Sequence, residues 1–513
     1  MLTSALTLIT NFFQFATEGL GTISDHLYGG LLAGLLIAAG IWFTVRTRGL
    51  QFRLFGQMLR AIAGSRDDDG GISSFQAFTI GLASRVGTGN IVGVALAITL
   101  GGPGAVFWMW VVAIVGMATG FIEATLAQMY KIRHPEGTFR GGPAYYISQG
   151  LGSRQWASVF AVVITFVFGF AYEATQANAI SGVMKGTFGV PPAWTAVILI
   201  LLTAPVVFGG ITVVARIAEW MAPIMAGLYA LLAVIVLLLN AHAIPAALVS
   251  IFEGAFGLDQ AFAGLVGGFT AAALNGIKRG LFSNEAGEGS VPNAAATATV
   301  AHPVQQGLIQ SLGVFVDTII VCTATAFIIL VSGVYSPALV EAGKLTPNAA
   351  GSLTSDAVAA TLGSWTAVPM TIVIFVLAFS SIIAAATYSE VSMTFISERP
   401  AWRWLPRLVS VASTGLGALA TLTVVWNTVD ITMAVMTLTN LVALIWLARW
   451  GVGALRDWDA QRAAGRTAPL FNGIGNPHLP GDLPGDVWTG ERASLAEADG
   501  TAADIPAATP ASS

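Results

Sequence analysis

Two segments of this chain place glycine and polar side chains inside otherwise apolar stretches. Residues 81–93 read GLASRVGTGNIVG, and residues 264–289 read GLVGGFTAAALNGIKRGLFSNEAGEG. Glycine and polar residues of these kinds lower helix propensity, so each segment favours a local break in a helix. A broken helix leaves backbone N–H groups that can bind an anion and carbonyl oxygens that can bind a cation. The chemistry that these residues suggest is therefore the binding of ions and zwitterions by backbone groups.

The sequence lacks the patterns of enzymes and of nucleotide-driven pumps. It contains no HExxH motif, no catalytic-triad spacing and no Walker A motif, so we expect no enzymatic activity and no direct use of ATP. The single cysteine, Cys322, excludes an intrachain disulfide and disfavours a thiol-ligated metal. A net charge of -4 gives no sign of a nucleic-acid partner. We expect no resident cofactor, and an ion gradient as the energy source.

Composition identifies the elements that must position these breaks as transmembrane helices. The 513 residues are 55% hydrophobic and only 10% charged, whereas soluble domains carry about 25% charged residues. A bilayer core of about 30 Å needs about 20 apolar residues per helix. We therefore expect an all-α membrane protein with about eleven transmembrane helices. The predicted spans lie near 29–45, 75–100, 104–130, 158–183, 194–215, 217–240, 261–287, 305–333, 366–393, 407–425 and 428–449.

Basic residues orient these spans. With the N-terminus outside, 20 of the 23 Lys and Arg residues fall on the inner side or in the inner part of a span; Lys185 and Lys344 fall outside, and Arg85 lies within a span. Such asymmetry is typical of the positive-inside rule. We expect a multi-pass protein of the plasma (inner) membrane of a prokaryote, with its N-terminus outside and its C-terminus in the cytoplasm.

The two interrupted helices open two successive sets of five spans. Because five is odd, the sets insert with opposite orientation, as in transporters built from a five-plus-five inverted repeat. The alternative is that glycine only permits tight helix packing. The predicted regions are an extracytoplasmic N-terminus (1–28), an extra transmembrane helix (29–45), a cytoplasmic amphipathic segment (46–74), a first repeat (75–240), a second repeat (261–449) and a disordered cytoplasmic tail (455–513).

Several motifs resemble the alanine or glycine:cation symporter family over residues 30–450. They are Gly87–Asn90 (GTGN), Gly101–Trp110 (GGPGAVFWMW), Gly141–Ile147 (GGPAYYI), Arg279–Gly287 (RGLFSNEAG) and Gly313–Thr323 (GVFVDTIIVCT). The resemblance implies a LeuT-like fold with one N-terminal helix before the inverted repeat. It also implies secondary active symport, by alternating access, of a small neutral amino acid with sodium, or in some members with protons. The implied partners are the amino acid, the sodium ion and the lipid bilayer, and we expect a monomer.

The resemblance assigns the substrate to the first break. Backbone N–H groups of Gly87, Thr88 and Gly89 would hold the substrate carboxylate, with the Asn90 side chain beside it. The alternative for Asn90 is a hydrogen bond between helices. Gln176 matches a polar position of the family, where it would accept from the substrate ammonium or simply bond within the bundle.

The remaining implied ligands come from the second break and from a serine pair. Phe269 and Thr270 would line the pocket from the second broken helix. Ser380 and Ser381 match a family Thr-Thr pair, and with the carbonyls of Ala83 and Val86 they would form a sodium site of oxygen ligands. Ser381 could also meet the substrate amino group. The alternative is that both hydroxyls bond back to their own helix.

The chain departs from the family at two positions. Residues 382–385 read IIAA where the family has Ile-Leu-Gly-Trp, so Ala385 replaces a tryptophan that bounds the substrate side chain. The pocket should then accept a larger neutral amino acid such as glutamine. Glu288, within Gly-Glu-Gly, adds a carboxylate that we expect near the cytoplasmic mouth. These departures leave open a larger substrate or proton coupling; a channel or a non-transporting sensor is the alternative from another class.

Charged residues that lie within predicted spans include Arg85, Glu123, Glu173, Asp317 and Glu390. Each would cost about 2.5–3.5 kcal/mol if it faced lipid at the bilayer centre, so all should face the interior and pair. We expect a carboxylate partner for Arg85. A gate or proton relay is the functional interpretation, and structural ion pairs are the alternative. Glu285, in the SNEAG sequence, is expected to cap a helix or act as a gate.

Overall fold

The computed structural model describes residues 19–63, 72–134, 138–257, 265–343, 345–346, 350–397 and 399–489. These residues are almost entirely helical, and the strands among them are β1 (Ile132–Arg133) and β2 (Phe139–Arg140), which pair antiparallel. The first half contains η1 (Tyr28–Leu32), α2 (Ala33–Arg46), α3 (Leu50–Arg53), α4 (Phe55–Ala63), α5 (Ser74–Arg85), η2 (Gly89–Gly93), α6 (Val94–Gly101), α7 (Gly104–Met129), α8 (Pro143–Gly150), α9 (Arg154–Phe166), η3 (Val167–Tyr172), α10 (Glu173–Phe188), α11 (Pro192–Phe208), α12 (Ile211–Leu239), η4 (Ala241–Ala243) and α13 (Ile244–Ala255).

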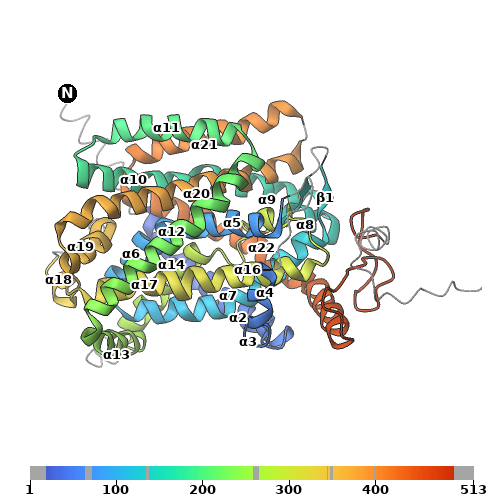
Figure 1. Ribbon diagram of the computed structural model, residues 1–513, viewed down its shortest axis with the longest axis horizontal. Coiled ribbons are helices and arrows are strands. Elements are labelled where there is room, and N and C mark those ends of the chain that lie inside the picture. The colour runs from blue at the N-terminus through green and yellow to red at the C-terminus, as the bar shows by residue number, and fades with distance from the viewer. Residues whose placement is uncertain are drawn as a thin grey trace, which may run out of the picture.

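The second half begins after residues that lie outside the described ranges. It contains α14 (Leu265–Asn284), α15 (Pro292–Ala295), α16 (Pro303–Val314), η5 (Phe315–Cys322), α17 (Thr323–Val331), α18 (Pro337–Glu341), α19 (Ala350–Leu362), η7 (Ser364–Thr366), α20 (Ala367–Ile396), α21 (Pro400–Leu419) and α22 (Leu422–Ala463). Helix α7 packs against α14 and α16, α21 packs against α10 and α11, and α20 lies between them against α5, α9 and α10 (Figure 1). Elements from both halves of the chain are therefore interleaved in the bundle.

Apolar helices long enough to cross a membrane confirm the predicted fold class. Within the described ranges, 6 helices are long and apolar enough to cross a membrane. The number rises to 7 if the bent pair Ser74–Arg85 and Gly89–Gly101 is counted as one span. The long ones are Gly104–Met129, Arg154–Phe188, Ile211–Leu239, Pro303–Val331, Ser364–Ile396 and Leu422–Ala463, and shorter apolar helices are Ala33–Arg46, Pro192–Phe208 and Ala241–Ala255. The chain is thus an all-α, multi-span membrane protein, while the number of eleven spans stays a prediction.

The first predicted interruption lies between α5 and η2. Helix α5 starts with a capping box in which the side chains of Ser73 and Gln76 each bond the other residue's backbone. It ends at Arg85 because Val86 takes non-helical angles (φ −79°, ψ 82°), and the helix resumes beyond it bent by 46°. Gly87 is needed here for close approach, since a Cβ atom would overlap the Ser381 hydroxyl. This break confirms the prediction for residues 81–93.

The second interruption is narrower than predicted. Helix α14 is regular from Leu265 to Asn284, and the chain leaves it only at Glu285. Glu285, Gly287 and Gly289 all have positive φ (54°, 88° and 85°), which ends the helix and turns the chain toward α15. The glycines at the start of residues 264–289 therefore do not break the helix where it is described. In this segment, glycine and polar residues therefore break the helix only near the C-terminal end of α14. There, other segments form hydrogen bonds with the backbone.

The C-terminal region corrects one prediction. Residues 455–489, expected to be disordered, consist of the end of α22 and an irregular segment that packs back on the bundle. Trp488 is buried and its Nε1 donates to the Gln128 carbonyl at 2.8 Å, and the Phe471 N–H donates to the Ala301 carbonyl at 3.1 Å. A few spaced apolar side chains anchor this segment, although its average composition is typical of disorder. Residues 490–513 lie outside the described residues.

Candidate substrate and cation site

The serine pair of α20 meets the end of α5. The Ser381 hydroxyl donates to the Ala83 carbonyl at 2.9 Å, and the Ser380 hydroxyl lies 3.4 Å from the same oxygen. Both hydroxyls also bond back to Leu377 of their own helix, at 3.2 and 2.7 Å. Val86, the other predicted carbonyl ligand, is the residue at which the backbone leaves α5. The structure therefore brings together Ala83, Ser380 and Ser381, and it displays the back-bonding alternative at the same time.

The amides of the first break are held by neutral side chains. The Gly87 N–H donates to Asn90 Oδ1 at 3.0 Å, and the Thr88 N–H donates to Gln176 Oε1 at 3.0 Å. Gln176 thus reaches the break from α10. Among the described residues, Gln176 Nε2 and Thr88 Oγ1 have no hydrogen-bond partner although both are buried. Two N–H donors and two free polar atoms accordingly meet in one buried place.

Asn90 ties the first break to η5 and to the end of α14. Its Nδ2 donates to Asp317 Oδ1 at 2.6 Å and to the Ser283 hydroxyl at 3.1 Å. Ser283 and Thr318 in turn donate to Asp317 Oδ2 at 2.6 and 2.7 Å. The interhelix alternative for Asn90 is therefore present in the structure. The Asp317 charge was predicted to lie inside the membrane, whereas Ser283 was not among the predicted site residues, although it stands in the recognisable SNEAG sequence.

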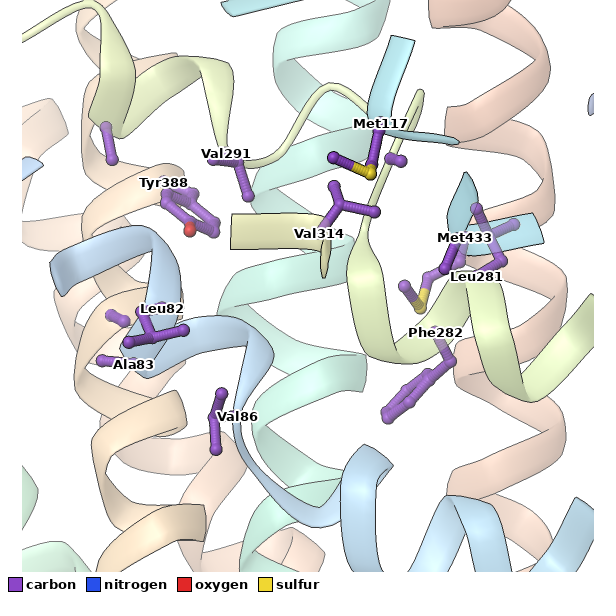
Figure 2. Close-up of a cluster of buried hydrophobic side chains, with 14 of the residues drawn as sticks. Leu82, Ala83, Val86, Met117, Leu281, Phe282, Val291, Val314, Tyr388 and Met433 are labelled. Carbon is purple, nitrogen blue, oxygen red and sulfur yellow. The ribbon is translucent and has the colours of Figure 1, made fainter. Parts of the chain in front are cut away.

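Aromatic side chains that the sequence analysis did not single out enclose the first break. Tyr172 donates its hydroxyl to the Ser84 carbonyl at 2.6 Å and stacks on Phe282, with ring centroids 5.3 Å apart. Phe282 also packs on Trp426, with centroids 4.6 Å apart. Figure 2 shows Val86 and Phe282 beside the two helix breaks, with Tyr388 projecting from α20 nearby. These buried rings lie beside the place where the amides and hydroxyls meet.

The predicted pocket residues outside this cluster differ in their placement. Thr270 is exposed on α14, about three helical turns before Phe282, so it does not line the buried site as predicted. Phe269 lies in α14, but its side chain is outside the described residues. Ala385 is fully buried on α20. Tyr388 follows Ala385 by three residues on α20, and its ring packs edge-on against Phe168 of η3, with ring centroids 5.2 Å apart.

The prediction that Arg85 pairs with a carboxylate is wrong, because no carboxylate of the described residues lies within ion-pair distance of its guanidinium. Arg85 is fully buried, and its Nη1 donates to the Gln310 carbonyl at 3.1 Å. Its Nε and Nη2 have no partner within the described part of the chain. The carboxyl groups of Glu123 and Glu285 attract the guanidinium only from a longer range. The reason is geometric, because Arg85 runs toward α16 and passes over Gly313.

The other intramembrane carboxyl groups find partners. Glu390 receives two hydrogen bonds from Arg407, at 2.7 and 3.2 Å, which confirms pairing there. Glu173 accepts from the Ser413 hydroxyl at 2.9 Å. Glu285 accepts from Ser84 of α5 at 2.7 Å and from Ser290 at 2.6 Å. Glu285 therefore bridges the two broken helices.

Facing helix breaks that gather backbone amides, a carbonyl and serine hydroxyls in one enclosed place define a secondary transporter of the LeuT-like fold. The fold is similar to that of MhsT in complex with L-phenylalanine, with a TM-score of 0.55 at 15% identity over 74% of this chain and 91% of that one. It is also similar to the Eremococcus coleocola manganese transporter, with a TM-score of 0.51 at 13% identity over 74% of this chain and 80% of that one. These likenesses concern the fold alone.

The chain belongs to the sodium:alanine symporter family, whose model matches residues 13–472. It is 43% identical to the amino-acid carrier protein AlsT of Bacillus subtilis over 89% of this chain and 95% of that protein. It is 41% identical to the probable sodium/glutamine symporter GlnT of Bacillus subtilis over 91% and 95%, and 35% identical to the sodium/alanine symporter AgcS of Methanococcus maripaludis over 83% and 94%. The predicted family is confirmed, and the chain is a membrane transporter rather than an enzyme.

Proposed function

We propose that this transporter imports alanine or a similarly small neutral amino acid together with sodium, and that both bind at the first helix break. The observation that carries the proposal is the short segment from Ala83 to Thr88, which presents a carbonyl oxygen to two serine hydroxyls and two amides to side-chain oxygens. A cation and a carboxylate can therefore bind within a few residues of each other. Opposite charges held this close favour each other's binding, which is the physical basis of symport.

The substrate carboxylate would take the place that neutral amide oxygens now occupy. Asn90 Oδ1 and Gln176 Oε1 accept from the Gly87 and Thr88 N–H groups. A carboxylate is the stronger acceptor, because charge-assisted hydrogen bonds are roughly twice as strong as neutral ones. Displaced from Thr88, the Gln176 oxygen would accept from the substrate ammonium. The rings of Tyr172 and Phe282 would then enclose a small side chain.

Sodium would be held by oxygen ligands alone. Ser380 and Ser381 would turn their hydroxyl protons away and offer lone pairs beside the Ala83 carbonyl, and the Val86 carbonyl would complete the set. Hard cations prefer such oxygen ligands. The serines bond the Leu377 carbonyl in this structure, so each hydroxyl has another acceptor toward which its proton can point.

The orientation and the assembly are part of the proposal. The distribution of Lys and Arg supports an N-terminus outside and a C-terminus in the cytoplasm of a prokaryotic cell. Uptake driven by the inward sodium gradient would follow from that orientation. A monomer suffices, because the residues that would bind sodium and substrate all come from one chain.

A larger neutral amino acid such as glutamine is the second candidate substrate. It is favoured by Ala385, which occupies the position at which the family carries a tryptophan, and by the similarity to a probable sodium/glutamine symporter. Gln176 Nε2, which has no hydrogen-bond partner among the described residues, could donate to a side-chain amide oxygen. Coupling to protons in place of sodium is the corresponding alternative for the ion.

Uptake into proteoliposomes tests both parts of the proposal. With an inward sodium gradient, labelled alanine should accumulate, and unlabelled amino acids added in turn should rank the substrates by competition. Ser381→Ala should abolish the sodium stimulation, whereas Ser332→Ala, in the loop after α17, should leave it intact. Competition by glutamine but not by alanine would move the substrate. Sodium stimulation that survives Ser381→Ala would refute the assigned sodium site.

A further inference from the structure

Glu288 is a buried carboxyl group that the sodium and substrate site does not use. Its side chain is fully buried, and neither carboxylate oxygen has a hydrogen-bond partner from any described residue. The other carboxyl groups near the breaks do accept hydrogen bonds; Glu285, for example, accepts from Ser84 and Ser290. Glu288 is therefore an unsatisfied polar group in the dry interior of the bundle.

The backbone holds Glu288 firmly in this place. It lies between Gly287 and Gly289, both with positive φ, in the loop between α14 and α15. Asn440 of α22 donates to the Gly287 carbonyl at 2.9 Å, and the Gly289 N–H lies 3.3 Å from Glu123 Oε2. Asn293 donates to the Gly289 carbonyl at 2.8 Å. The carboxyl group cannot leave the interior while this loop keeps its conformation.

The charges around Glu288 do not balance it. The charged and titratable groups within electrostatic range come from several elements: Glu285 of the same loop, Glu123 of α7, Arg85 of α5, Asp430 of α22 and Tyr28 of η1. Asp430 is already paired with Arg279 of α14. Arg85 attracts Glu123 and Glu285 as well as Glu288. One guanidinium cannot neutralise three carboxylates, so the enclosed loop would carry surplus negative charge if all were ionised.

We propose that Glu288 is a proton-binding site of this transporter, holding a proton while its loop is enclosed, as here, and releasing it when the loop meets water. An unpaired carboxylate in a low-dielectric interior takes up a proton rather than remain charged. A cation would need several oxygen ligands, whereas a proton needs only the carboxyl group itself. The reaction is the simple addition of one proton to the carboxylate to give the neutral acid.

Alternating access would make this proton part of the transport cycle. The loop lies directly after α14 and is bridged by Glu285 to α5, so a movement that opens the first break also disturbs the surroundings of Glu288. Opening would admit water and favour the ionised form, while closing would require the proton to return. Transport should therefore slow as the pH rises, because the ionised carboxylate opposes closure. This inference rests on alternating access but on neither the amino acid nor the sodium ligands.

Infrared spectroscopy of the purified protein in lipid tests the proton directly. The wild type at neutral pH should display the carbonyl stretch of a protonated carboxyl group, and Glu288→Gln should lose one such contribution. Glu390→Gln is the matched control, since Glu390 is also buried but is paired with Arg407. That control should leave the carboxylic-acid region of the spectrum unchanged. An unchanged spectrum in Glu288→Gln would overturn the proposal.

Uptake at different pH values supplies the second test. Glu288→Gln keeps the shape of the neutral acid, so sodium-driven alanine uptake should persist and become less dependent on pH. If Glu288→Gln altered the sodium dependence of uptake but left the infrared spectrum unchanged, Glu288 would belong to a cation site, and the proton assignment would be overturned. Absence of alanine uptake in the wild type would refute the proposed substrate, and the spectra would still decide the protonation of Glu288.

Discussion

The two helix breaks of this transporter differ in charge and in backbone geometry. The first, at Val86–Thr88, offers backbone groups to neutral side chains, and its glycine is needed for close approach to Ser381. The second, from Glu285 to Gly289, has three residues with positive φ and two buried carboxyl groups. On the two proposals above, the first break is suited to bind a zwitterion and a cation, and the second is suited to take up and release a proton at an enclosed carboxyl group. Similar breaker residues in the sequence thus serve different physical purposes.

The largest expected effect separates binding from folding at the first break. In Gly87→Ala the new methyl group would overlap the Ser381 hydroxyl and lie 3.0 Å from Gln176 Oε1. Since the backbone there does not need positive φ, the protein should fold but lose essentially all sodium-driven uptake. Uptake and melting temperature should be measured together. Gly182→Ala in α10, where a Cβ atom meets nothing within 4 Å, should behave as the wild type; normal uptake by Gly87→Ala would remove this break from the site.

Alanine in the second break should act on stability instead. In Gly289→Ala the residue would need φ of 85°, and its Cβ would lie 2.7 Å from atoms of Phe160 and Pro143. Positive φ costs a non-glycine residue of order 1–3 kcal/mol, so the melting temperature and the yield of folded protein should fall. If Gly289→Ala were as stable as the wild type and defective only in uptake, the contrast between the two breaks would be wrong.

The carboxylate that joins the breaks should have an intermediate effect. Glu285 accepts from Ser84 and from Ser290, and glutamine can accept with only one of its two terminal atoms. Loss of one charge-assisted hydrogen bond costs about 1.5–3 kcal/mol. Glu285→Gln should therefore lower the melting temperature, and should also weaken the effect of substrate on stability if the bridge couples the breaks. Full retention of that ligand-induced stabilisation would show that the breaks act independently.

A site remote from both breaks gives the smallest effect and a baseline for pH experiments. His302 caps α16 and bonds Asp457 at 3.0 Å, and burial lowers the pKa of its imidazole below the ordinary value. The unfolded chain therefore takes up a proton before the folded one, so stability should fall as the pH drops below about 6.5. His302→Gln should flatten this acid dependence of the melting temperature without changing uptake near neutral pH. An unchanged slope would assign the acid sensitivity to other groups.

Much of the site could be predicted because its residues are tied to short motifs. Gly87, Asn90, Gln176 and Ser381 lie together in the structure, since backbone breaks and paired hydroxyls are local features of the sequence; their roles in binding stay predictions. Thr270 failed because glycine content alone does not locate a break: α14 stays helical at Thr270 and turns only at Glu285.

Other features depend on which segments pack together. The aromatic enclosure by Tyr172, Phe282 and Trp426 joins rings from three distant parts of the chain, and no spacing in the sequence announces it. The partner of Arg85 was likewise decided by packing, which directs the guanidinium toward α16.

The residues alone predict that this protein spans a membrane with helices, that two of these helices break, and that the chain resembles a family of cation-coupled symporters. Hydrophobic run lengths and local backbone preferences act over a few turns, so they are legible without a structure. The packing of the bundle is what encloses Glu288 with no hydrogen-bond partner among the described residues, lets Glu285 join the breaks, and holds residues 464–489 against the helices. Burial and pairing depend on neighbours far away in the chain, and those neighbours are set by the packing of the whole bundle.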